Sequence, residues 1–150
     1  MSDLEIDFEF EEPGQDFRLP ELKLEYDTEE LPTRLLDRGV TDLLVRVVGY
    51  TEYVPVDDDS EFLADAYIAL TRILKQRQQS AHHSVFLGDG RIRIEAIITG
   101  TSVRCEVKNF PHLRKDLGSS QQLDLSLQAY AHGWWRAVEQ LMKPLTVLPQ

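Results

Sequence analysis

The sequence contains a single cysteine, Cys105, and no long apolar run. One cysteine cannot form a disulfide within the chain. A membrane-spanning helix needs about 20 consecutive apolar residues, and no stretch approaches this length. The first ten residues are rich in acids, whereas a secretory signal starts with basic residues followed by an apolar stretch. These features predict a soluble cytoplasmic protein.

The sequence also has no surplus of basic residues. It holds 26 Asp and Glu residues against 16 Lys and Arg residues, which gives a formal net charge of −10. Nucleic-acid phosphates and anionic membrane surfaces repel a chain of this charge. We therefore expect the partners to be neither nucleic acids nor membranes.

Motifs for metal binding, nucleotide binding and nucleophilic catalysis are missing as well. The adjacent pair His82-His83 has no HExxH or CxxC spacing around it. Gly88-Asp89-Gly90 lacks the lysine of a phosphate-binding loop, and a hairpin turn explains it. Cys105 is expected on the inner face of a strand, as an inert thiol. We therefore predict a non-enzymatic protein without a metal or cofactor.

The negative charge is concentrated in the first thirty residues. Residues 1–30 hold twelve acids and two bases, a balance of −10, while residues 31–150 hold fourteen of each. Large apolar residues alternate with these acids, which is typical of half-buried strands. The alternating apolar residues are Leu4, Ile6, Phe8 and Phe10, and then Leu22, Leu24 and Tyr26. With a turn at residues 12–16, the pattern predicts an acidic β-hairpin over residues 1–30 with one wet face.

The remainder of the chain predicts groups of strands and two long helices. A strand is expected near residues 43–53, and Gly49 within it indicates a bulge or a close backbone approach. Apolar residues at helical spacing predict helices over about 59–79 and 127–143, the second with Ser126 as N-cap.

Between these helices we expect a meander of strands. Asp89-Gly90 and Gly100-Thr101 indicate two tight hairpin turns in it. The order of elements is typical of the α+β class. We predict one domain, with residues 42–143 as a β-α-β-β-β-β-α body. It should contain a single, mostly antiparallel sheet of about five to seven strands, with two long amphipathic helices packed on it.

The acidic side chains of the predicted hairpin form the candidate binding surface. They are Glu5, Asp7, Glu9, Glu11, Glu21 and Glu25. Carboxylates at every second position of a strand are about 7 Å apart, roughly the phosphate spacing of a nucleic-acid strand. Such a face can occlude the basic groove of a nucleic-acid enzyme, and its charge accelerates association with a basic partner. The alternative is a solvated edge that serves solubility and prevents aggregation.

Two aromatic residues are further candidates for partner contact. Trp134 belongs to the apolar stripe of the last helix, and Trp135 lies about 100° further around it. Trp135 is either part of a wide buried stripe or an anchor at the rim, where exposed Trp is typical of binding hot spots. The same two interpretations apply to Tyr53.

Local sequence and the order of elements give a resemblance to a known group of proteins. It rests on Val-Val-Gly-Tyr at 47–50, EFLADAYIALTRILK at 61–75, SVFLGDGRIRIE at 84–95 and the closing helix with its Trp pair. Over roughly residues 42–143 the chain resembles small bacterial immunity and immunity-like proteins. The resemblance implies a non-enzymatic protein that binds and neutralises a toxin of the same or a sibling cell. The acidic segment lies outside the matching part.

The leading prediction is therefore a stoichiometric binding protein, such as an inhibitor of a basic nuclease toxin. One alternative is a small-molecule-binding or regulatory domain, with a pocket between sheet and helices roofed by residues 109–120. Another is a subunit of a larger assembly that self-associates through Tyr53 and Trp135.

Overall fold

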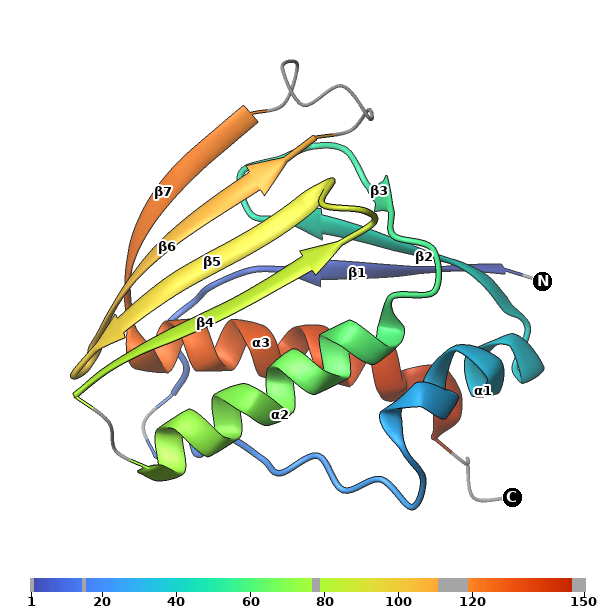
Figure 1. Cartoon of the computed structure of the whole chain (residues 1–150), viewed down its shortest axis with the longest axis horizontal. Helices are drawn as coiled ribbons and strands as arrows, with labels where there is room; N and C mark the ends of the chain where they lie inside the picture. Colours follow the sequence, from blue (N-terminus) through green and yellow to red (C-terminus); the bar gives the residue numbers. More distant parts are fainter. Residues whose placement is uncertain (1, 15, 77–78, 111–118, 147–150) are drawn as a thin grey trace.

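The computed structural model of the chain has the element order of an α+β protein (Figure 1). It describes residues 2–14, 16–76, 79–110 and 119–146. The elements are β1 (Ser2–Phe8), η1 (Thr28–Glu30), α1 (Leu31–Asp37), β2 (Val40–Val47), β3 (Val54–Pro55), α2 (Ser60–Gln76), β4 (Ser80–Leu87), β5 (Ile92–Thr99), β6 (Ser102–Asn109), β7 (Ser119–Ser126), α3 (Leu127–Met142) and η3 (Lys143–Leu145). The predicted α+β class is confirmed.

The strands form two sheets rather than the single predicted sheet. In sheet A, β2 lies between β1 and β3, parallel to β1 and antiparallel to β3. Sheet B is an antiparallel meander of β4, β5, β6 and β7 in chain order. The expected antiparallel sheet therefore exists as sheet B, while the N-terminal strands build a separate, mixed sheet.

The predicted acidic hairpin over residues 1–30 is wrong. Its first half is a strand, β1, but β1 pairs in parallel with β2 instead of with residues 21–26. Residues 21–24 form no strand, although Leu22 and Leu24 are half-buried and their neighbours exposed. Period-two alternation indicates an extended chain with one buried side. Packing on helices satisfies that pattern as well as pairing with a strand does.

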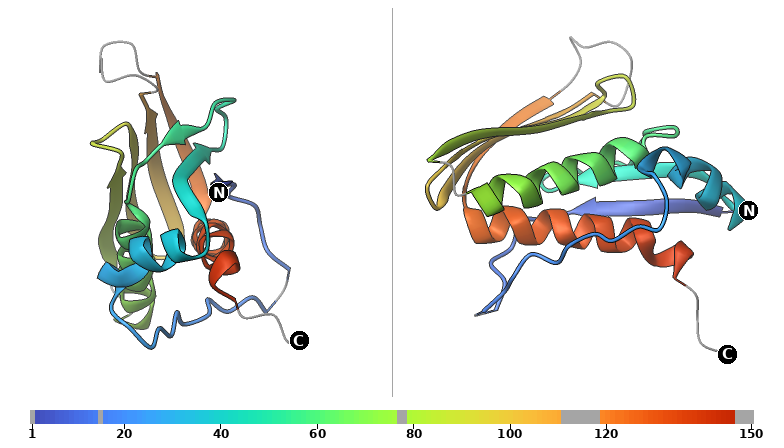
Figure 2. Two further views of the ribbon diagram at one scale, coloured as in Figure 1. Left: turned by 90° about the vertical axis from the view of Figure 1, so that its right-hand side faces the viewer. Right: turned by 60° about the horizontal axis from the view of Figure 1, so that its bottom comes forward.

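The predicted positions of the two long helices are confirmed. Together with both sheets, these helices enclose one apolar core. α2 and α3 lie side by side beneath sheet B, and α3 also runs along β1 (Figures 1 and 2). Ser126 is the N-cap of α3, since its hydroxyl accepts a hydrogen bond of 3.0 Å from the Ala129 amide. Trp134 is fully buried, and its ring lies 5.0 Å from those of Phe8 and His83. This one side chain joins α3 to both sheets.

Two predicted hairpin turns are confirmed, whereas the bulge predicted at Gly49 is not. Asp89-Gly90 and Gly100-Thr101 do connect the strands of sheet B, and Gly100 has the positive φ of 61° that its turn requires. Gly49 is not a bulge within a strand, but the predicted close approach is present, because a Cβ there would lie 2.6 Å from Gln121 Nε2. With a φ of 88° it lies where the chain turns back after β2, so that β3 pairs antiparallel with β2.

Candidate functional site

The outer face of sheet A carries three of the predicted acids. Alternate residues of β1 are buried, so Glu5 and Asp7 point outward, and the exposed Glu9 follows the strand. β2 adds Asp42, directly opposite Asp3. We call these five residues the acidic face. Like charges opposite one another on neighbouring strands are destabilising. Acids dispersed over the surface would give the same solubility without this loss of stability.

One base and one tyrosine lie within the acidic face. Arg46 of β2 is opposite Asp7, and its Nε and Nη2 atoms are each 2.9 Å from Asp7 Oδ1. The Tyr53 hydroxyl donates to the same carboxylate at 2.9 Å. The Arg46 guanidinium lies 4.6 Å from the centre of the Tyr53 ring. Asp7 is therefore paired inside the molecule, and it organises the middle of the face.

The charges around this cluster act on Tyr53 and Arg46. Partial burial, the hydrogen bond to Asp7 and the charge of Glu5 raise the pKa of Tyr53 to about 12. Partial burial opposes the charge on Arg46, but Asp7 and Glu9 hold its pKa above the usual value. Glu5 and Glu9 form no ion pair with any described residue. Their carboxylates are therefore available to meet a cation from outside.

Helix α3 fixes the free side of β1. The Asp7 amide donates to Gln140 Oε1 at 2.9 Å, and Gln140 Nε2 donates to the Asp7 carbonyl at 3.0 Å. Gly133 permits the close approach, because a Cβ there would lie 2.8 Å from the Glu9 carbonyl oxygen and would clash with the Phe10 ring. With β2 on one side and α3 on the other, β1 presents its acids from a rigid support.

Glu11 lies beside the acidic face in a small notch between the end of β1 and α3. The notch has a volume of about 200 Å³, and Asp7, Glu9, Glu11, His132 and Arg136 line it. His132 Nδ1 lies 3.2 Å from the Glu11 carbonyl oxygen, which can only accept, so the imidazole donates. The notch continues the acidic face toward α3 and places two basic side chains at its border.

Glu21 and Glu25 are not brought to the acidic face. Both lie on residues 16–27, which cross the helices and are called the strap here. Glu21 is paired with Lys75 of α2, and this hydrogen bond and charge lower the pKa of Glu21. Glu25 is exposed and forms no ion pair with a described residue. Of the six predicted acids, four therefore gather at β1 and two lie on the helical side.

The strap is held against α2 and α3 by specific contacts. The Phe17 ring meets the His132 ring edge-on at 5.1 Å. The Tyr67 hydroxyl of α2 donates to the Pro20 carbonyl. Near its end, Tyr26 lies beneath the Arg34 guanidinium, 3.8 Å from the ring centre. The strap is therefore a defined part of the fold.

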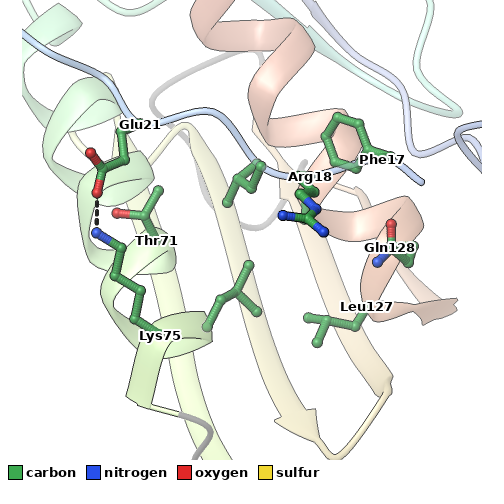
Figure 3. Close-up of a pocket in the computed structure, with 10 residues that line it drawn as sticks. Phe17, Arg18, Glu21, Thr71, Lys75, Leu127 and Gln128 are labelled. Carbon is green, nitrogen blue, oxygen red and sulfur yellow. Dashed lines mark hydrogen bonds and ion pairs between the residues drawn. The ribbon is translucent and has the colours of Figure 1, made fainter.

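A groove of about 720 Å³ lies between the strap and the two helices (Figure 3). Its walls include Leu19, Leu74 and Leu127, with Lys75 and its partner Glu21 at one end. Arg18 reaches over the groove from the strap and has no ionic partner among the described residues. The groove thus combines an apolar wall with an unpaired cation, and no sequence motif indicated it.

The predicted anchors Tyr53 and Trp135 are both engaged inside the molecule. Tyr53 bonds to Asp7, and Trp135 is half-buried with its ring 5.9 Å from that of Tyr67. The pocket expected beneath residues 109–120 falls largely on residues 111–118, which lie outside the described residues.

The histidine pair separates as its alternation predicted, with His82 exposed and His83 buried. His83 Nε2 lies 2.7 Å from the Ala66 carbonyl oxygen, so this nitrogen carries a proton. His83 Nδ1 then accepts from the Tyr130 hydroxyl at 2.6 Å. Burial lowers the pKa of His83 and raises that of Cys105 to about 12, so this thiol is inert at neutral pH.

No protein-family model matches this chain, and comparisons with curated proteins and with solved structures found no match either. Across the described ranges, no group of three or more His, Cys, Asp or Glu residues is arranged to hold a metal ion. In the same part of the chain, no helix combines the length and apolar character required to cross a membrane. Function must therefore be inferred from the surface chemistry.

Proposed function

We propose that the protein is a non-enzymatic binding protein that docks a basic protein through the acidic face of sheet A. The observation that carries this proposal is the placement of Glu5 and Glu9. Both carboxylates are exposed, form no ion pair with a described residue and stand on either side of the bonded cluster of Asp7, Arg46 and Tyr53. A buried, helix-backed strand holds them in position before the partner arrives.

The mechanism is occlusion of the partner's cationic groove. Carboxylates along β1 repeat about every 7 Å, a spacing that suits Lys and Arg side chains arranged to bind a phosphate backbone. Pre-organised charge of this kind raises the association rate roughly ten- to a thousand-fold. Tyr53 adds an aromatic ring next to the acids, a residue type favoured at binding hot spots. The partner class is a nuclease-type toxin, and the role is that of an immunity protein or inhibitor.

Charge reversal tests the acidic face. The partner to use is a basic domain encoded beside the gene, with its affinity measured by calorimetry. Glu5→Lys/Glu9→Lys should weaken binding at least about a hundred-fold, because two attractive contacts become repulsive. The matched control is Glu106→Lys/Asp124→Lys, an equal charge change on the outer face of sheet B. Unchanged affinity in the first variant would remove the acidic face from the mechanism.

A second candidate function is supported by the strap groove. Its volume of about 720 Å³ is in the range of small-molecule sites, and Arg18, which has no ionic partner among the described residues, supplies a cation beside an apolar wall. A ligand with an apolar body and an anionic group fits this chemistry.

Thermal unfolding with alkyl carboxylates and the matching alcohols tests the groove. A carboxylate that occupies it should raise the melting temperature, since ligand binding stabilises the folded state. Arg18→Gln should abolish the shift, while Lys23→Gln on the exposed side of the strap should preserve it. Equal shifts from carboxylate and alcohol would contradict an anion site at Arg18.

A further inference from the structure

Within the part of the chain that the structure describes, the outer edge of β4 has no hydrogen-bond partner. The Gly100 amide donates to the Gln79 carbonyl at 3.1 Å, which sets the alternation of the ladder between β4 and β5. Odd-numbered residues of β4 therefore bond to β5. The backbone groups of the even-numbered residues point away from sheet B and find no partner among the described residues; they are Ser80, His82, Ser84 and Phe86.

The other sheet edges carry features that prevent pairing with another chain. β1 bears acids and is capped by Gln140, and β3 has two residues and ends at Pro55. β7 carries Asp124, and its last residue, Ser126, bonds to the carboxylate of Glu12. β4 is eight residues long, SAHHSVFL, without a formal charge or a proline. An uncharged, regular edge of this length is a template for strand addition.

Helix α2 carries an apolar stripe beside this edge that is covered only in part. Phe62, Ala66, Ala69 and Ile73 recur at helical spacing on one side of α2; Phe62 and Ala69 are exposed, Ile73 is half-buried and Ala66 is buried. The Ala66 carbonyl contacts His83, which places this side of the helix next to β4 (Figure 1). Phe62 is 51 % exposed. On the opposite, outer face of sheet B, Phe86 of β4 is 52 % exposed. A strand added to β4 would extend sheet B over the stripe.

We propose that two copies of the chain associate through β4, paired antiparallel about a two-fold axis. With the axis at His83, Ser80 of one copy lies opposite Phe86 of the other, and His82 lies opposite Ser84. This register pairs seven of the eight residues of the strand, Ser80–Phe86, and uses the outward backbone groups of all four even-numbered residues. No charges of the same sign meet along the edge. The two copies of sheet B then form one continuous eight-stranded sheet.

The same axis brings the two α2 helices together in a complementary way. Because Ala66 contacts His83, the small residues Ala66 and Ala69 lie closest to the axis. The helices then run antiparallel. Asp65 and Arg72 flank Ala69 on the exposed side, four residues before it and three after it. Asp65 of each copy therefore faces Arg72 of the other. The pair is isologous, so association stops at the dimer.

The dimer does not depend on the proposed function. The interface consists of β4 and α2, while the acidic face belongs to β1, β2 and the residues beside them. Each dimer would thus present two acidic faces. Failure of one proposal leaves the other intact.

Sedimentation velocity over a wide range of concentration tests the dimer. The wild-type chain should sediment with twice the mass of one chain. Ala69→Glu places two like charges at the axis on an exposed position and should produce monomers. Gln128→Glu makes the same kind of change on an exposed position of α3 and should leave the dimer intact.

A second variant addresses the strand itself. Ser84→Pro removes an amide that points to the free edge and is unused within one chain, so the fold should survive. It should weaken self-association at least about tenfold. Circular dichroism reports folding of each variant. A wild-type monomer at every concentration, aggregates that grow beyond the dimer, or an unaltered dimer in folded Ala69→Glu would overturn the proposal.

Discussion

The free sides of β1 and β4 are both sheet edges, but their surroundings differ. Both strands lie at the edge of a sheet and both contribute buried residues to the core. On β1, a glutamine from α3 binds the edge backbone and acids occupy the outer face. β4 itself carries no formally charged residue, and no side chain of the described residues caps its edge. This difference is why we propose a charged partner for the face of β1 and another strand for the edge of β4.

The largest expected effect is on stability, and it compares a phenylalanine on the inner face of β1 with one on the outer face of β4. Phe8 of β1 is fully buried against Trp134, whereas Phe86 of β4 is 52 % exposed. Phe8→Ala should lower the free energy of unfolding by about 3–5 kcal/mol. Phe86→Ala should cost under about 1 kcal/mol in the monomer. Urea unfolding at low protein concentration measures both. Similar losses would show that the core does not depend on the inner face of β1.

The approach of α3 to the N-terminal segment predicts the next effect. A Cβ at position 133 would clash with Phe10 and lie 2.8 Å from the Glu9 carbonyl. Gly133→Ala should therefore destabilise the fold by about 1–3 kcal/mol, despite the higher helix propensity of alanine. Gly14→Ala, where no atom lies within 4 Å, is the control and should be close to neutral. A stabilised Gly133→Ala variant would contradict the close packing of α3 on this segment.

The cap on β1 itself can be removed. Gln140→Leu deletes both hydrogen bonds to the Asp7 backbone and should cost about 1–3 kcal/mol, because edge groups are left unpaired. Hydrogen exchange of the Asp7 amide should accelerate in this variant, while that of the Ile6 amide, on the β2 side, should change less. Unchanged exchange at the Asp7 amide would mean that contacts other than those of Gln140 protect this edge of β1.

We expect the stability of the fold to depend on pH through His83, on the inner face of β4. Burial depresses the pKa of His83 in the folded state below its ordinary value of 6.5. The unfolded chain therefore binds the proton first, and stability is lost as the pH falls below about 6.5 and through the folded-state pKa. The slope should not exceed about 1.4 kcal/mol per pH unit. His83→Gln should reduce this dependence and His82→Gln should retain it, as measured by urea unfolding at pH 7.5 and 5.5. Equal pH dependence in both variants would contradict a neutral His83.

The elements set by local sequence were predictable. Asp89-Gly90, Gly100-Thr101 and the helical spacing in 60–76 and 127–142 depend on neighbouring residues, and all appear in the structure. The partner of β1 was not predictable, because Leu4 and Leu43 are far apart in the chain and alternation does not encode parallel pairing.

The candidate site was predictable only in part, for the same reason. The exposure of Glu5 and Glu9 follows from alternation within β1. The pairing of Asp7 with Arg46 depends on the register between two strands, and no local pattern reports it. The strap groove likewise depends on packing between the strap and two distant helices.

Calorimetric titration of the basic partner into two variants tests the central claim most directly. One variant, Glu5→Lys/Glu9→Lys, alters the acidic face, and the other, Ala69→Glu, alters the surface beside β4. We expect the first variant to lose affinity at least about a hundred-fold and the second to bind like the wild-type chain. Equal affinity of both variants for the partner would contradict this expectation.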